Sequence, residues 1–178
     1  MQNNNYLEDI TNAYYTAVID KEKPSKYEYQ PTLIFNNYQK GMNVLSSIEK
    51  ELRKCTEFYF LVAFITKDGI ACLKNILKEL SDNNIKGKIL TTNYLTFNSP
   101  LAYEELLMYK NIEVKVFDGD FHIKGYFFKK SNSITFMSGS ANLTQNALKN
   151  NKEWNIKLSS LENGKIVHDA MKDRKSVV

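Results

Sequence analysis

The sequence predicts an α/β fold, in which a mixed β-sheet is flanked by helices on both faces. Residues 57–65 (EFYFLVAFI) form a nearly continuous apolar run, which is typical of a central strand buried on both sides. Strand-like and helix-like segments alternate along the rest of the chain, an order that indicates α/β layering. With 178 residues, the chain is long enough to bury one core of ordinary size.

Hydrophobic periodicity predicts the helices and strands that surround this central strand. A stripe formed by Leu45, Ile48 and Leu52 indicates an amphipathic helix. Pro100 suits the first turn of a later helix, because its ring already holds a helical φ. Together the patterns predict helices over residues 44–54, 68–80 and 100–110 and strands over residues 57–65, 88–92 and 112–117.

The last third of the chain is predicted to contain a β-hairpin, a short helix and one more strand. Residues 121–142 have two halves rich in Phe, Tyr, Ile and Thr, and the polar residues 129–133 separate them. We expect the helix over residues 143–149 and the strand over residues 153–158. In that strand Glu153 and Asn155 share one face, whereas Trp154 lies on the other, where we expect it to pack in the core.

The chain divides by composition into three parts. Residues 1–30 are polar and rich in Tyr, with a helix-like stretch at 6–19, and we interpret them as an N-terminal extension. Residues 31–160 carry the alternating pattern and form the predicted domain. Residues 161–178 are charged and form a C-terminal tail, which can lead to further domains in a longer protein.

Composition restricts the classes of function. The net charge of +4 permits a polyanionic partner without requiring one. Cys55 and Cys72 are too few for a disulfide framework, so we expect buried free thiols and a cytoplasmic location. No apolar run of about 18 residues and no signal-peptide pattern occur, so we expect no membrane contact. The sequence also lacks a Gly-x-x-x-x-Gly-Lys-Ser/Thr loop and metal-ligand spacing, so we expect no ATPase, no cofactor and no metal.

Four polar residues of the hairpin form a candidate site. His122 and Lys124 are two residues apart, as are Ser140 and Asn142, so each pair points to one face of its strand. If the hairpin turns about Asn132, His122 lies opposite Asn142 and Lys124 lies opposite Ser140, with Cβ atoms about 5 Å apart. Either half alone is more often ordinary surface or an ordinary turn. Together the four groups converge on a patch about the size of a phosphate.

The pattern His-x-Lys followed by Gly-Ser-x-Asn resembles the signature of the phospholipase D superfamily. Asn142 follows His122 by 20 residues and Glu153 follows Asn142 by 11, which resembles the spacing in nuclease-like branches of that superfamily. The broader signature has Asp five residues after its Lys, where this chain has Lys129, and this departure argues against a lipase. A closer resemblance rests on residues 61–65, 89–94, 139–148 and 153–155. They resemble the N-terminal phospholipase D-like domain of bacterial DEAD/DEAH-box helicases, which is related to some restriction endonucleases.

The resemblance implies metal-independent, nuclease-like hydrolysis of a phosphodiester in a DNA-processing, helicase-associated or restriction-type system. His122 would attack phosphorus to give a phosphohistidine that water resolves, while Lys124 and Asn142 hold the non-bridging oxygens. Ser140 would hydrogen-bond the phosphate or the imidazole. Glu153 would fix the tautomer of the imidazole from its second nitrogen.

The resemblance also implies partners. Superfamily members with a single motif pair two subunits so that each supplies one His, so we expect a homodimer with its active site at the twofold interface. Nucleic acid, DNA in the first place, is the expected substrate, and Asn155 is a further candidate for substrate contact. A fused or associated ATP-dependent helicase is the other expected partner.

Two other functions stay open. The domain can be a non-catalytic module of a helicase that binds nucleic acid or phosphate without turnover. It can also be an enzyme that acts on phospholipid head groups, although the sequence shows no amphipathic membrane anchor.

Overall fold

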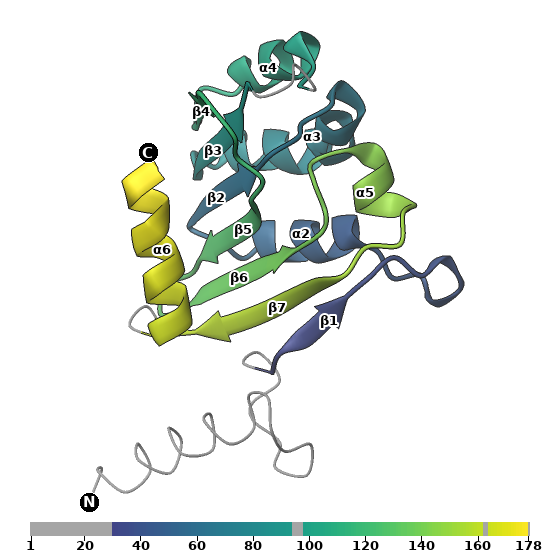
Figure 1. Cartoon of the computed structure of the whole chain (residues 1–178), viewed down its shortest axis with the longest axis vertical. Helices are drawn as coiled ribbons and strands as arrows, with labels where there is room; N and C mark the ends of the chain where they lie inside the picture. The colour runs from purple at the N-terminus through teal and green to yellow at the C-terminus, as the bar shows by residue number, and fades with distance from the viewer. Residues whose placement is uncertain (1–29, 94–97, 162–163, 178) are drawn as a thin grey trace, which may run out of the picture.

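The computed structural model describes residues 30–93, 98–161 and 164–177, and the helix-like stretch at 6–19 lies outside these ranges. The strands within them are β1 (Thr32–Ile34), β2 (Glu57–Val62), β3 (Lys86–Thr92), β4 (Ile112–Phe117), β5 (Lys124–Lys129), β6 (Ile134–Gly139) and β7 (Asn155–Ser160). They form one sheet in the order β1-β7-β6-β5-β2-β3-β4 (Figure 1). β2, β3 and β4 run parallel and all other neighbours are antiparallel, so the sheet is mixed, as predicted.

Helices of the described ranges cover one face of this sheet. They are α2 (Val44–Leu52), α3 (Lys67–Asp82), α4 (Pro100–Leu107) and α5 (Gln145–Lys149). Their apolar sides pack in one core with Phe58 and Phe60 of β2 and Tyr126 of β5, each at most 1% exposed. Asn43 and Thr66 cap the N-termini of α2 and α3, because their side chains accept hydrogen bonds from first-turn N–H groups.

The helix α6 (Lys165–Val177) covers part of the other face (yellow in Figure 1). Its Val167 is 1% exposed and belongs to a second apolar cluster with Tyr59, Leu61 and Phe127. The charged tail, in which the sequence pattern indicates no clear element, thus contains a helix with a buried side. Helices on both faces confirm the predicted fold class. In the part of the chain that the structure describes, no helix is long and apolar enough to cross a bilayer.

The predicted elements are present with bounds that differ by a few residues, and the end of the central strand is one such difference. The strand was predicted to reach Ile65 but leaves the sheet after Val62. The reason is a tertiary contact, since Ile65 forms an isolated bridge with Leu143, far along the chain. Residues 63–65, which follow β2, support the candidate site described below.

The hairpin of β5 and β6 is present, but its predicted register is wrong by one residue. Gly125 pairs with Ser138, one position before the partner that the predicted turn requires. The tip of the turn has two residues instead of one, and two-residue loops are the commonest in hairpins. A slip of one residue moves side chains to the opposite face of a strand. Continuing the observed register puts Gly139, and not Ser140, opposite Lys124.

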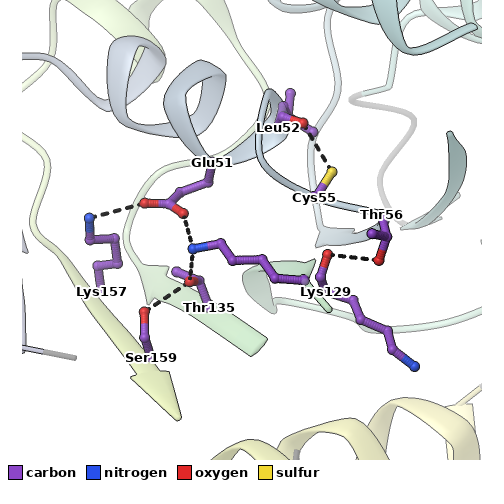
Figure 2. Close-up of polar contacts among 9 residues, drawn as sticks. Glu51, Leu52, Cys55, Thr56, Lys129, Thr135, Lys157 and Ser159 are labelled. Carbon is purple, nitrogen blue, oxygen red and sulfur yellow. Dashed lines mark hydrogen bonds and ion pairs between the residues drawn. The ribbon is translucent and has the colours of Figure 1, made fainter. Parts of the chain in front are cut away.

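A buried ion cluster ties α2 to the end of the sheet that carries this turn (Figure 2). The Glu51 carboxylate, 5% exposed, lies 2.8 Å from Lys130 Nζ and 3.2 Å from Lys157 Nζ. Lys130 Nζ also donates to Thr135 Oγ1, which shares a hydrogen bond with Ser159 Oγ. Burial by itself raises the pKa of the Glu51 carboxyl, but the two ammonium groups outweigh it and hold the pKa below its ordinary value.

Glu51→Gln should destabilise the protein by about 3 kcal/mol near neutral pH, because two ammonium groups are left partly buried without a counter-charge. Since the folded-state pKa is lowered, the carboxylate contributes fully above pH 4.5, and the contribution is lost as the pH falls through the lowered value. Urea unfolding at neutral pH and again below pH 4.5 measures this: the gap between wild type and variant should narrow in acid.

Glu79→Gln is the matched control for this experiment. Glu79 is 52% exposed and its pair with Arg53, at 3.7 Å, should contribute little. An equal loss of stability in the Glu51 and Glu79 variants would contradict the role given to the buried cluster.

Both cysteines are free, as predicted, but only Cys55 is also buried as predicted. Cys55 is buried and donates from Sγ to Leu52 O at 3.1 Å (Figure 2). Burial raises the pKa of its thiol to about 11, whereas Cys72 on α3 is half-buried. The Cys55 side chain is therefore a core group and not a reactive thiolate.

Candidate active site

The residues predicted to form a site lie at one edge of the sheet. β5 begins at Lys124, which pairs with Val62 at the end of β2 and aligns with Gly139 at the end of β6. Gly139 in turn pairs with Asn155 at the start of β7. The ends of four strands thus meet here. The remaining predicted residues, His122, Ser140, Asn142 and Glu153, lie in the segments that enter or leave these strands.

His122 and Lys124 are in direct contact. Lys124 Nζ lies 2.9 Å from His122 Nδ1 and 3.1 Å from His122 Nε2, and it donates to His122 O at 3.1 Å. The lysine is 8% exposed, whereas the histidine is open to solvent. Since Nζ is almost equally far from both ring nitrogens, the ammonium lies against the imidazole ring and not in line with the lone pair of either nitrogen.

Lys124 and Glu153 are the two buried charges of the site. Burial lowers the pKa of the Lys124 ammonium below its ordinary value, and the negative charge of Glu153 acts in the opposite direction. Glu153 is 7% exposed and so adds a carboxylate that is only weakly screened by water. The carboxylate therefore helps to keep the lysine charged.

Ser140 links the end of β6 to the segment before β7. Its Oγ donates to Glu153 Oε2 and accepts from Trp154 N at 3.1 Å, and its N donates to Trp154 O at 3.0 Å. We expected Glu153 to contact the imidazole of His122, but its hydrogen-bond partner within the described ranges is Ser140. Ser140 faces β7 and not Lys124, as the slip in register requires.

Phe64 connects the two halves of the site, a role that sequence reasoning missed. Its N donates to Asn142 Oδ1 at 3.1 Å, and its O accepts from Leu143 N at 3.0 Å. Its ring lies edge-on to His122, with ring centroids 6.1 Å apart. Asn142 thus uses Oδ1 within the chain, so Nδ2 is the side-chain atom that can donate to a ligand. The only sequence signal was the apolar run at 57–65, which a buried strand already explains.

Asn98 fixes the segment that carries Phe64. Its Oδ1 accepts from Ile65 N at 2.6 Å, and its Nδ2 donates to Ala63 O and to Thr91 Oγ1, both at 3.1 Å. These bonds join the segment after β2 to the end of β3. A lone Asn in a polar stretch gives no sequence signal for such a role.

Gly139 is required by the close approach of β6 and β7. A Cβ atom at this position would lie 2.0 Å from Trp154 O and 2.6 Å from Asn155 Cα, so no larger residue fits without movement of the backbone. Asn155 is 1% exposed, and its Oδ1 accepts from Ala141 N at 3.2 Å. Its buried Nδ2 has no partner among the residues described. Asn155 thus supports the Ser140–Asn142 segment, and its contact with substrate stays a prediction.

The prediction that Trp154 packs in the core is wrong, because its side chain is 73% exposed. The predicted alternation of faces along residues 153–155 is correct, since Glu153 and Asn155 on either side of Trp154 are buried. Trp154 lies on the sheet face that α6 packs against, but α6 does not cover this part of the face. Ile156 and its β1 partner Leu33, which share that face, are 44% and 45% exposed.

The titratable side chains of the described ranges include no group of three or more His, Cys, Asp or Glu that could hold a metal ion. The second histidine, His168, is exposed on α6, where its Nδ1 lies 3.6 Å from Asp169 Oδ1. It therefore belongs to the helix that covers the second face and not to the strand ends that form the site.

A mixed α/β sheet that presents His-x-Lys and Gly-Ser-x-Asn at one edge defines a phospholipase D-like domain. A family model described as "Cardiolipin synthase, PLD-like domain" matches residues 45–174, and the chain belongs to this family. A search of curated proteins finds no match.

Solved structures share the fold at low sequence identity. NucT from Helicobacter pylori is 20% identical with a TM-score of 0.66, over 84% of this chain and 96% of NucT. Nuc from Salmonella typhimurium, a phospholipase D family member, is 14% identical with a TM-score of 0.61, over 83% of this chain and 94% of Nuc. Phosphatidylserine synthase from Haemophilus influenzae is 14% identical with a TM-score of 0.58, over 82% of this chain and 38% of the synthase. The predicted membership of the phospholipase D superfamily is confirmed.

Proposed function

We propose that this chain hydrolyses phosphodiester bonds of nucleic acid with His122 as the nucleophile. The observation that carries the proposal is the contact between an exposed imidazole and a buried ammonium, His122 and Lys124, next to the available N–H donors of Asn142. Family membership and the fold shared with Nuc and NucT support the same class of reaction.

The reaction proceeds in two displacements at phosphorus. In the first, a ring nitrogen of His122 attacks, the P–N bond forms and the P–O bond to the leaving group breaks, while an acid on the opposite side protonates the leaving oxygen. In the second, a base takes a proton from water, the water oxygen attacks phosphorus and the P–N bond breaks. The products are a phosphate monoester, an alcohol and the restored imidazole.

Lys124 and Asn142 hold the non-bridging oxygens of the phosphate. Before substrate binds, the Lys124 ammonium lies against the His122 ring. A phosphate oxygen is a stronger acceptor for an ammonium, so substrate binding draws the donor away and leaves the ring nitrogen ready for attack. The same donors then stabilise the charge that shifts in the transition state.

Glu153 and Ser140 position the other groups. The Glu153 carboxylate opposes the effect of burial on the Lys124 pKa and so favours the charged lysine. Through its hydrogen bond from Ser140 it also fixes the segment that leads to Asn142. We therefore propose that Glu153 and Ser140 position Lys124 and Asn142 and do not take part in making or breaking bonds at phosphorus.

Nucleic acid, DNA in the first place, is the substrate that the resemblance to helicase-associated domains favours, and the net charge of +4 suits a polyanion. A fused or associated ATP-dependent helicase would deliver the strand, since this chain carries no phosphate-binding ATPase loop. Binding without turnover is the second candidate function, because one subunit brings a single His to these strand ends.

Cleavage of DNA in the presence of EDTA tests the proposal. We expect cleavage to persist, because the described side chains form no metal-binding group. Cleavage that requires added Mg²⁺ would contradict the mechanism. Binding of DNA with no cleavage at all would favour the binding module.

The reaction needs a second proton-handling group, and we propose that His122 of the partner subunit supplies it across a twofold axis. Wild type mixed with an equal amount of His122→Ala should pair at random, so that about a quarter of the dimers keep two imidazoles. Activity should then fall to about a quarter of that of wild type at the same total concentration, and not to about half. Full activity in a protein that sedimentation shows to be monomeric at micromolar concentration would contradict the dimer.

A further inference from the structure

The backbone of Trp154 is hydrogen-bonded to Ser140 of the candidate site, but its exposed ring projects to the sheet face opposite to Glu153 and Asn155, and nothing in the proposed chemistry uses it. Its 73% exposure is the highest among the large apolar side chains of the described residues. An indole in water forgoes the stabilisation that burial of its large apolar surface gives. Such a side chain at a functional edge calls for a ligand that covers it.

The ring stands on a rigid support. Ser140 N donates to Trp154 O at 3.0 Å, and Trp154 N donates to Ser140 Oγ at 3.1 Å, so the backbone is bonded to the site itself. The residues on either side, Glu153 and Asn155, are 7% and 1% exposed. The backbone that carries the ring is therefore held in place before any ligand arrives, which reduces the entropy lost on binding.

The ring is also part of a longer apolar strip. Ile156 and Leu33 are 44% and 45% exposed and lie opposite each other on β7 and β1, on the face that α6 leaves open. Ile123, directly after His122, is 37% exposed. Lys152, exposed two residues before Trp154, adds a positive charge beside the strip. Apolar side chains next to a lysine suit a ligand with flat aromatic groups on an anionic backbone.

We infer that Trp154 stacks on a base of a single-stranded nucleic acid whose phosphate lies at His122 and Lys124. A duplex keeps its bases stacked on one another, so only a single strand or a frayed end can offer a base to the indole. Lys152 contacts a neighbouring backbone phosphate. The inference rests on the proposed function for the position of the phosphate, and it deepens that function by naming a single strand as the substrate.

The fluorescence of the protein tests the inference directly, because Trp154 is the only tryptophan in the sequence. Stopped-flow mixing with a short oligothymidylate should quench the emission before cleavage proceeds. An oligonucleotide with the same backbone length and abasic sites in place of thymine should quench it much less. The difference isolates the contact with the base from the contact with phosphate.

Variants measure how much the ring contributes to affinity. With a dye-labelled oligothymidylate followed by anisotropy, Trp154→Leu should bind about tenfold more weakly, and its Kd should approach that for the abasic strand. Trp154→Phe keeps an aromatic face and should recover part of the loss. Leu107→Ala removes an equally exposed apolar side chain, 70% exposed on α4, and should bind as wild type does.

Two results would overturn the inference. One is equal affinity of wild type and Trp154→Leu for oligothymidylate. The other is emission that changes with protein concentration but not with oligonucleotide, which would show that a second copy of the chain covers the ring. All of these measurements follow binding. Quenching without cleavage would contradict only the proposed hydrolysis. Cleavage without quenching would contradict only the role of Trp154.

Discussion

His122→Ala should lower the rate of phosphodiester cleavage by about 10⁴-fold or more, because it removes the group that forms the bond to phosphorus. The residual rate reflects the phosphate contacts of Lys124 and Asn142, which remain. His122 is exposed, so its loss takes little from the core, and the thermal midpoint should stay within about 2 °C of the wild-type value. Initial rates on a labelled oligonucleotide in EDTA provide the measurement.

His168→Ala is the matched control, since the chain has two histidines and His168 is exposed on α6. It should cleave at the wild-type rate. Rapid quenching of the wild-type reaction should also trap one cleaved strand on the protein, joined through its terminal phosphate by a bond that survives alkali and is lost in acid, as an N–P bond requires. Near-normal cleavage by His122→Ala would remove the phosphohistidine mechanism.

Lys124→Ala should lower the cleavage rate by about 10² to 10³, the usual effect of losing one donor to a transition-state oxyanion. The ammonium lies 2.9 Å from His122 Nδ1 and is 8% exposed, so water replaces it poorly. The loss should fall mainly on kcat, because the clamp acts on charge that shifts in the transition state. Lys78→Ala, at an exposed position on α3, is the control and should leave the rate unchanged.

The lowered pKa of Lys124 adds a signature in the pH profile. Cleavage should decline at alkaline pH as the ammonium loses its proton, and the decline should begin below the ordinary lysine value of 10.5. Glu153→Gln removes the charge that opposes the effect of burial, so the lysine pKa should fall further and the alkaline limb should move to lower pH. If the pH at which cleavage declines is the same in Glu153→Gln as in wild type, Glu153 does not act through Lys124.

The fold class, and the identity of the residues that form the candidate site, could be predicted because they depend on local sequence patterns. Alternation along a strand places His122 with Lys124, and hairpin connectivity brings Ser140 and Asn142 back to the same edge. The register was not predictable in the same way. It depends on whether one or two residues form the tip of the turn, and a polar stretch of five residues permits both.

The features that could not be predicted from the sequence depend on contacts between distant segments. Phe64 and Asn142 are 78 residues apart, and Glu51 and Lys157 are 106 residues apart, so no periodic pattern contains either pair. The exposure of Trp154 has a similar origin. Alternation shows which residues share a face of a strand, but only the path of a later helix shows whether that face is covered.

Lys130 of the buried ion cluster and Lys124 of the candidate site lie at opposite ends of β5, whereas Lys157 of the cluster lies only two residues from Asn155 on β7. Lys124 begins β5 and Lys130 follows its last residue, so six residues of extended chain, roughly 20 Å, separate the two groups. Substitutions that far apart usually add in free energy. Substitution of Lys130 can therefore change the pH range over which the protein stays folded without changing the rate of cleavage.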